Sequence, residues 1–209
     1  MNVDGIGAIV VGGAHGLGAM IARALGDAGA DVSIFDIDGA KAAEVAAAFG
    51  GYSQHCDLRD ETVVAACVTS AMSRFGQAAR VIVNCAMFSV DAPIIGPEGK
   101  VFLPLFNNAV TVNLIGVNTL ISYGVQAMID MPPMKHGTRG IIINVLPLGT
   151  GNPTHTSPAT YASTMGARAL IEAADHGLSA RNIRCLTMDV DVSAPDEAVK
   201  TILNQIASA

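Results

Sequence analysis

The stretch Val11-Gly-Gly-Ala-His-Gly-Leu-Gly18 decides the fold. It follows the continuous apolar run Ile6–Val11 and opens a helical pattern. Glycines at a turn from a strand into a helix let backbone amides and the helix N-terminus face a diphosphate with no Cβ in the way. The alternative is a tight turn that only lets the helix pack closely on the strand. We predict a dinucleotide at this turn, in contact with Gly12, His15, Gly16, Leu17 and Gly18.

Short apolar runs alternate with helical stretches along the rest of the chain. The runs are continuous, which is typical of parallel strands that are covered on both faces. The predicted strands are Ile6–Val11, Asp31–Phe35, Tyr52–Cys56, Val81–Cys85, Gly140–Val145 and Arg184–Val190, and the predicted helices are Leu17–Ala28, Gly39–Phe49, Glu61–Phe75, Ala109–Ile129 and Pro158–Ala174. This alternation predicts a single Rossmann-like α/β domain over residues 1–209, with a doubly wound parallel sheet in the order 3-2-1-4-5-6.

The composition narrows the range of partners. Of the 209 residues, 51% are hydrophobic and 14% are charged, and the formal net charge is −6. Because nucleic acids and anionic membranes bind basic patches, we expect neither as a partner. The small number of charges favours a homodimer or homotetramer. No apolar run approaches the roughly 20 residues of a membrane span, and four scattered cysteines indicate reduced thiols in a cytoplasmic protein.

Two aspartates follow the second and third predicted strands. Asp36 stands about twenty residues after the glycine turn, where a carboxylate accepts hydrogen bonds from ribose hydroxyls and repels a 2′-phosphate. Asp36 therefore favours NAD over NADP, and a plain turn residue before Asp38-Gly39 is the alternative. Asp57 ends the third strand, where it either receives the adenine amino group or serves as a cap or loop residue.

These residues resemble those of the short-chain dehydrogenase/reductase family from Ile6 to about Arg184. The family's TGxxxGxG loop is matched with Val11 in place of the threonine, and Asp36 and Asp57 stand at its NAD-selecting and adenine positions. The segment Val83-Asn-Cys-Ala-Met87 is similar to the family's Asn-Asn-Ala-Gly strand end. The resemblance implies an oxidoreductase that uses NAD, and it adds Leu58, Asn84 and Ala86 to the cofactor contacts.

The resemblance also supplies the catalytic candidates. Asn113, in Thr111-Val-Asn-Leu-Ile-Gly116, matches the family's helix-embedded asparagine, and Tyr161 stands at the tyrosine of YxxxK, which contacts both substrate and cofactor. The strand Gly140–Asn144 and the insertion around Gly96–Leu105 are most similar to type 2 3-hydroxyacyl-CoA dehydrogenases. This similarity implies hydride transfer between NAD(H) and a small hydroxy or keto substrate of that kind.

The chain departs from the family at the reaction centre. The lysine that lowers the pKa of the catalytic tyrosine is replaced by Met165, a loss of about a hundredfold in rate, or on the order of 3 kcal/mol. The catalytic serine aligns with Pro147 or Leu148, and the Pro-Gly after the sixth strand aligns with Val190-Asp191. The family's substrate lid and seventh strand have no counterpart, so we expect the sixth strand at an edge of the sheet unless a partner covers it.

Two further side chains could replace the lost groups. His155 precedes the helix of Tyr161 and is a capable acid or base near neutral pH, although a loop histidine without a task is the alternative. Arg168 lies on nearly the same helix face as Tyr161, but a salt bridge is its simpler role. Three functions stay open: a dehydrogenase that uses Tyr161, Asn113 and His155, a catalytically silent NAD-binding or regulatory subunit, and another reaction on the same scaffold.

Overall fold

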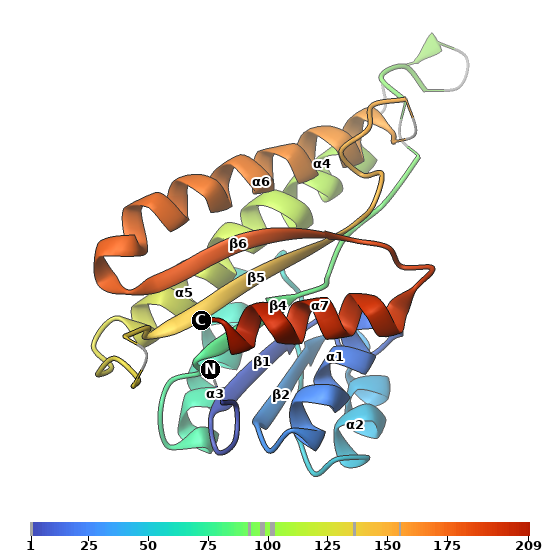
Figure 1. Cartoon of the computed structure of the whole chain (residues 1–209). Coiled ribbons are helices and arrows are strands. Elements are labelled where there is room, and N and C mark those ends of the chain that lie inside the picture. Colours follow the sequence, from blue (N-terminus) through green and yellow to red (C-terminus); the bar gives the residue numbers. More distant parts are fainter. Residues whose placement is uncertain (1, 92, 97–98, 101–102, 136, 155) are drawn as a thin grey trace.

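The computed structural model describes residues 2–91, 93–96, 99–100, 103–135, 137–154 and 156–209. Within these residues six parallel strands form a sheet in the order β3-β2-β1-β4-β5-β6 (Figure 1), which confirms the predicted topology. The strands are β1 (Gly7–Val11), β2 (Asp31–Asp36), β3 (Tyr52–His55), β4 (Val81–Asn84), β5 (Gly140–Pro147) and β6 (Ile183–Val190). They agree with the predicted runs to within two residues at each end.

Helices cover both faces of the sheet. One face packs against α1 (Gly16–Asp27), α2 (Gly39–Ala47) and α7 (Pro195–Ala207), and the other against α3 (Glu61–Phe75), α5 (Val117–Met128) and α6 (Pro158–Leu178). Along β1, Val10 belongs to the first core and Ile9 to the second, and both are buried. The strand therefore has no polar face, which is why its sequence is a continuous apolar run.

Several helix ends have local causes in the residues that stand there. The Asp60 carboxylate accepts the backbone N–H of Thr62 at 2.9 Å and so caps α3. Ser157 is the N-cap of α6, with Pro158 in the first turn, where its missing N–H costs nothing. Gly76 ends α3 with a φ of 66°, a conformation that favours glycine.

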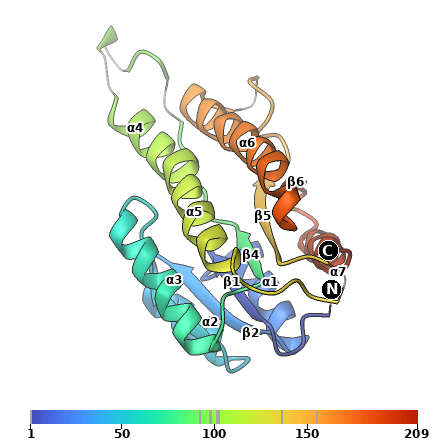
Figure 2. The same cartoon turned by 90° about the vertical axis from the view of Figure 1, so that its left-hand side faces the viewer.

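The helix predicted over Ala109–Ile129 begins earlier and is not uniform. The segment α4 (Pro104–Val110) begins before the predicted start at Ala109, and η2 (Thr111–Gly116), a π-helical segment, connects it to α5. The three form one continuous rod beside α6 (Figure 1, Figure 2). A Cβ on Gly116 would lie 2.7 Å from the carbonyl oxygen of Leu58, so this glycine lets the rod touch the loop after β3.

In the part of the chain that the structure describes, β6 is an edge strand with β5 as its neighbour. The backbone N–H of Cys185 in β6 donates to the Asp175 carboxylate of α6 at 2.7 Å. Thus α6 extends past its predicted end at Ala174 and uses the added turn to reach the sheet edge. None of the helices in the described residues has the length and apolar character of a membrane span.

Candidate functional site

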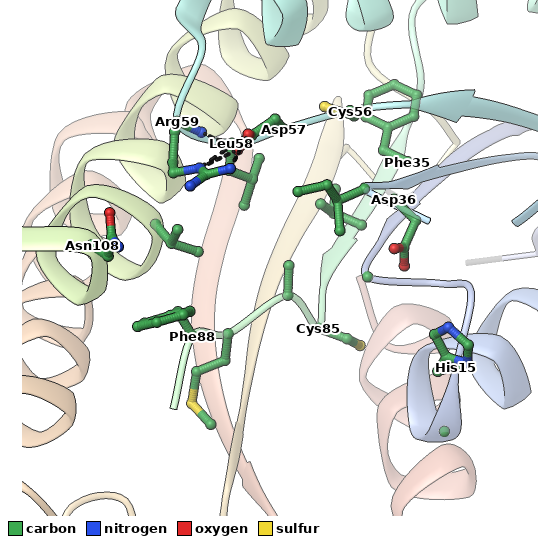
Figure 3. A pocket seen from close by; sticks show the side chains of 17 residues that line it. His15, Phe35, Asp36, Cys56, Asp57, Leu58, Arg59, Cys85, Phe88 and Asn108 are labelled. Atoms are coloured by element: carbon green, nitrogen blue, oxygen red, sulfur yellow. Dashed lines mark hydrogen bonds and ion pairs between the residues drawn. The ribbon is translucent and has the colours of Figure 1, made fainter. Parts of the chain in front are cut away.

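A pocket of about 510 Å³ opens at the carboxyl ends of the strands on the β1–β3 side of the sheet. Ligands bind at this edge in open α/β sheets, next to the point where the strand order reverses. Figure 3 shows Asp36 and His15 on one side of the pocket and Arg59, Asn108 and Phe88 on the other. The lining residues are Val11, Gly12, His15, Gly16, Phe35, Asp36, Ile37, Cys56, Asp57, Leu58, Arg59, Cys85, Ala86, Met87, Phe88, Asn108 and Val112.

The glycine turn forms a backbone cradle for an anion. Gly12 has a φ of 73°, and a Cβ there would lie 2.6 Å from the backbone nitrogen of Ala86, so a side chain would collide with the chain that leaves β4. The first turn of α1 has no side-chain cap among the described residues, whereas Asp38 caps α2 and Asp60 caps α3. Because Gly16 lines the pocket, the free amides at this helix start fit a diphosphate.

The Asp36 carboxylate is held in place by backbone groups. One carboxylate oxygen accepts the N–H of Ala14 at 2.9 Å, and the other accepts the N–H of Asp38 at 2.9 Å. Each carboxylate oxygen can accept more than one hydrogen bond. Asp36 therefore lies in the pocket wall with acceptor capacity left for ribose hydroxyls.

His15 and Asp38 form an exposed pair at the rim of the pocket. The Nε2 of His15 lies 3.0 Å from a carboxylate oxygen of Asp38. The backbone N–H of Lys41, and after it the His15 side chain, lower the pKa of Asp38. The histidine in the glycine turn is thus oriented toward a carboxylate of its own chain.

Asp57 lines the pocket but is bound by Arg59, a residue that the sequence analysis missed. The Nη2 of Arg59 donates to Asp57 at 2.6 Å, and its Nε lies 2.9 Å and 3.0 Å from the two carboxylate oxygens. This guanidinium lowers the pKa of Asp57. The helix cap considered for Asp57 is provided by Asp60, and Asp57 instead positions Arg59 in the pocket wall.

One end of the first pocket is formed by residues that are far apart in the sequence. Leu58 follows β3, while Asn108 and Val112 come from α4 and η2. Leu58 and Val112 give this end of the pocket an apolar surface of the kind that a purine ring fills. No local sequence motif predicts that Asn108 and Val112 line the pocket, because their position depends on the packing of Gly116 against Leu58.

Four of the predicted cofactor contacts, Leu17, Gly18, Asn84 and Tyr161, lie outside the lining of this pocket. Asn84 donates to Asn144 Oδ1 at 2.7 Å and accepts the N–H of Ala86 at 3.2 Å, so it shapes the end of β4. Leu17 packs against the core on the α1 side of the sheet. Gly18 lies against the carbonyl oxygen of Gly12, where a Cβ would approach to 2.1 Å. Leu17, Gly18 and Asn84 therefore support the glycine turn and the end of β4 and do not line the pocket.

A second cavity of about 700 Å³ lies between the loop after β4, the end of β5 and the start of α6. Its described lining is Met87, Ser89, Val90, Asp91, Pro147, Leu148, Gly149, Thr150, Thr154, Thr156, Ser157 and Thr160. Tyr161 is next to this set but lines neither cavity, and its hydroxyl has no hydrogen-bond partner among the described residues. His155 lies outside the residues that the structure describes.

Asn113 is buried and all of its amide contacts are internal. Its Oδ1 accepts the N–H of Phe88 at 2.7 Å, and its Nδ2 donates to the Phe88 carbonyl and to Ser163 Oγ, both at 2.9 Å. Arg168 pairs with Asp189 at 2.6 Å and is directed toward β6. The structure therefore gives Asn113 a positioning contact with the loop after β4 and gives Arg168 a salt bridge.

The strand order, the glycine turn and the Asp36 carboxylate define a Rossmann-type dinucleotide-binding fold. A family model described as short chain dehydrogenase matches residues 7–201. The chain therefore belongs to the short-chain dehydrogenase family, which confirms the resemblance. Members of this family are oxidoreductases that bind a nicotinamide dinucleotide.

Individual relatives agree with this family. The 3-hydroxyacyl-CoA dehydrogenase type-2 of Rattus norvegicus is 31% identical over 147 residues, which cover 68% of this chain and 56% of the relative. The 2,5-dichloro-2,5-cyclohexadiene-1,4-diol dehydrogenase of Sphingobium indicum is 28% identical over 180 residues, 84% of this chain and 68% of the relative. The chain spans between 47% and 69% of the length of several curated relatives that it matches.

Solved structures show the same fold. The crystal structure of a metagenomic short-chain oxidoreductase in complex with NADP has a TM-score of 0.84 and 29% sequence identity, and the match covers 100% of this chain and 94% of that chain. The crystal structure of a 3-hydroxyacyl-CoA dehydrogenase type-2 from Mycobacterium avium has a TM-score of 0.79 and 25% identity, with 88% of this chain and 74% of that chain covered.

Proposed function

We propose that the protein binds NAD in the first pocket and that its dehydrogenase chemistry is suppressed. The observation that carries the proposal is the Asp36 carboxylate, which two backbone N–H groups fix beside the glycine turn. The ribose of the adenosine half binds Asp36, and its diphosphate binds at the start of α1. When bound, NAD(H) supplies hydride transfer.

The charges around the pocket support NAD over NADP. A 2′-phosphate would meet Asp36 and the neighbouring Asp38, and like charges in contact cost several kcal/mol. The basic side chains of the described lining, His15 and Arg59, are each paired with a carboxylate. An NADP complex therefore needs a cation that these two groups do not supply.

The residues around Tyr161 support suppressed proton transfer. Met165 replaces the lysine of the family motif, and its sulfur lies 3.9 Å from where a Cβ of Gly151 would be, so a thioether fills this place. Asn113 uses its amide on Phe88 and Ser163. Met165 cannot supply the positive charge that the lysine of the family motif gives to the catalytic tyrosine, so the proton relay through Tyr161 lacks one of its parts.

A second candidate function is slow dehydrogenation of a 3-hydroxyacyl or similar substrate in the second cavity. Tyr161 would be the proton donor, and Asn113 and His155 would support it. The hydroxyl-rich cavity beside Tyr161 and the likeness to type 2 3-hydroxyacyl-CoA dehydrogenases favour this candidate. A homodimer or homotetramer is proposed for either function.

Calorimetric titration with NAD, NADH and NADP tests the binding site. We expect NAD and NADH to bind more tightly than NADP, and Asp36→Ala to weaken NAD binding by about tenfold, or 1.4 kcal/mol. Asp27→Ala is the matched control, because this aspartate is exposed at the far end of α1. Absence of binding by all three dinucleotides would overturn the proposal.

Turnover of a 3-hydroxyacyl-CoA distinguishes the two candidates. If chemistry is suppressed, the double variant of Met165→Lys with Pro147→Ser should exceed the unmodified protein by about a hundredfold. Met165→Lys with Leu148→Ser covers the other alignment of the serine. Measurable turnover by the unmodified protein that neither double variant raises would favour the dehydrogenase candidate instead.

A further inference from the structure

Met87 stands where the two cavities meet. Among the described residues it is the one that lines both of them. A dinucleotide in a doubly wound sheet crosses from one half to the other where the strand order reverses, which here is between β1 and β4. Met87 follows β4 and lines both cavities, so a ligand that filled both would lie against it.

The backbone on both sides of Met87 is held by side chains. The N–H of Ala86 donates to Asn84 Oδ1 at 3.2 Å. Asn113 binds both the N–H and the carbonyl of Phe88, at 2.7 Å and 2.9 Å. These contacts hold the main chain in place on both sides of Met87, so an opening between the cavities would come most easily from its thioether side chain, which has three rotatable bonds.

The first cavity holds a complete set of groups for an adenosine diphosphate. Asp36 offers a ribose acceptor, and the free amides at the start of α1 offer a diphosphate site. Leu58 and Val112 line the apolar end, where a base is excluded from water. Recognition of the adenosine half thus requires nothing from the second cavity.

The second cavity has hydroxyl groups that are already used within the protein. Thr150 donates to the Pro147 carbonyl at 2.9 Å, and Thr160 donates to the Val90 carbonyl at 3.1 Å. Ser157 also donates to the Val90 carbonyl. A group that entered this cavity from the first one would gain few new hydrogen-bond donors, and it would meet Met87 at the boundary.

We propose that the first cavity binds nucleotides that contain adenosine 5′-diphosphate as complete ligands, and that Met87 is a specificity-determining residue that prevents the rest of a dinucleotide from adding affinity. This inference rests on the proposed nucleotide site. ADP-ribose, NAD and NADH then bind with dissociation constants within about threefold of one another. The protein consequently does not distinguish the oxidised from the reduced dinucleotide.

Calorimetry with ADP-ribose, NAD and NADH tests the inference on the unmodified protein and two variants. Met87→Ala removes the barrier, so NADH should bind about tenfold more tightly while ADP-ribose changes by less than about threefold. Met87→Leu is the matched control, because it keeps the bulk and should preserve the original ratio. Thermal unfolding of both variants checks that they are folded. If Met87→Ala does not fold, the ratio of NADH to ADP-ribose affinity in the unmodified protein decides the test.

The outcomes separate this inference from the proposed function. NADH binding more than about tenfold tighter than ADP-ribose in the unmodified protein would overturn the role of Met87 and leave the NAD site intact. An equal change for both ligands in Met87→Ala would also overturn it. If neither ADP-ribose nor a dinucleotide binds, the first cavity is not a nucleotide site, which contradicts both the role of Met87 and the proposed function.

Discussion

The Asp36 carboxylate accepts the backbone N–H of Ala14 at 2.9 Å, across 22 positions of the chain. Ala14 is 1% exposed, so water has little access to this N–H while the carboxylate is in place. The side chain that offers an acceptor to a ribose therefore also ties the glycine turn to the end of β2. Nucleotide binding and the stability of the glycine turn are therefore coupled through the Asp36 carboxylate.

Removal of this carboxylate should destabilise the protein without any ligand. We expect Asp36→Ala to lower the free energy of unfolding by about 1–3 kcal/mol, because it leaves the Ala14 N–H buried and unsatisfied. Asp36→Asn keeps one acceptor oxygen and should lose less. Urea unfolding measures the free energy of unfolding of both variants. The control Asp27→Ala should stay within about 0.5 kcal/mol of the unmodified protein. Equal stability of Asp36→Ala and the unmodified protein would contradict the coupling.

The charge of Asp36 should set the choice between dinucleotides. Asp36→Asn keeps the size of the side chain and removes the repulsion of a 2′-phosphate. We expect the ratio of NADP to NAD affinity to rise by about tenfold, or 1.4 kcal/mol, in calorimetric titrations at low salt. The exposed Asp27→Asn should leave the ratio unchanged. A constant ratio in Asp36→Asn would show that another group selects the cofactor.

Asn113 should act as a structural clamp on the loop after β4. Asn113→Ala leaves the N–H and carbonyl of Phe88 and the hydroxyl of Ser163 without this partner, so we expect a loss of about 2–4 kcal/mol in urea unfolding. Asn107→Ala, on the exposed surface of α4, should change stability by less than about 0.5 kcal/mol. A similar loss in both variants would argue against the clamp.

The pairing of Asp57 with Arg59 should give a pH-dependent contribution to stability. Because Arg59 lowers the pKa of Asp57 in the folded state, the contribution is fully present above the ordinary carboxyl pKa of about 3.9 and is lost as the pH falls through the lowered value. Since the Arg59 side chain is 47% exposed, the contribution is at most about 1 kcal/mol.

Urea unfolding between pH 7 and pH 3 measures this contribution. The stability difference between the unmodified protein and Arg59→Gln should be constant from pH 7 to about 5 and should shrink below about pH 4. Arg74→Gln is the control, because Arg74 stacks on the Tyr52 ring and has no carboxylate partner among the described residues. A difference that grew on acidification would reverse the expected sign.

The parts of the molecule that could be predicted are those with local causes. Both faces of the β1 strand are buried, so Ile6–Val11 is apolar throughout, and Gly12 is glycine because a Cβ would meet Ala86. The cap at Asp60 follows from the same kind of short-range contact. Such causes lie within a few residues of the pattern or at the meeting point of two adjacent strands.

The parts that could not be predicted depend on packing between distant segments. Asn108 and Val112 reach the pocket because Gly116 lets their helix approach Leu58, a contact between residues far apart in the sequence. The π-helical form of Thr111–Gly116, which holds Asn113, was predicted as part of one uniform helix, because its cause lies in how the rod packs and not in a local motif. Arg59 stands two residues after Asp57, yet its direction into the pocket wall is set by the turn that joins them.

The contact between Asp175 and the edge strand β6 bears on how copies of the chain meet. An unpaired strand edge is a template for aggregation, since its free N–H and carbonyl groups bind another strand. Here the Cys185 N–H is already bound by a carboxylate at 2.7 Å, in a charge-assisted hydrogen bond. A second sheet that docked on β6 would first have to break this bond and bury the Asp175 charge. Asp175 thus occupies one of the N–H groups of β6 through which a further strand could pair with the sheet.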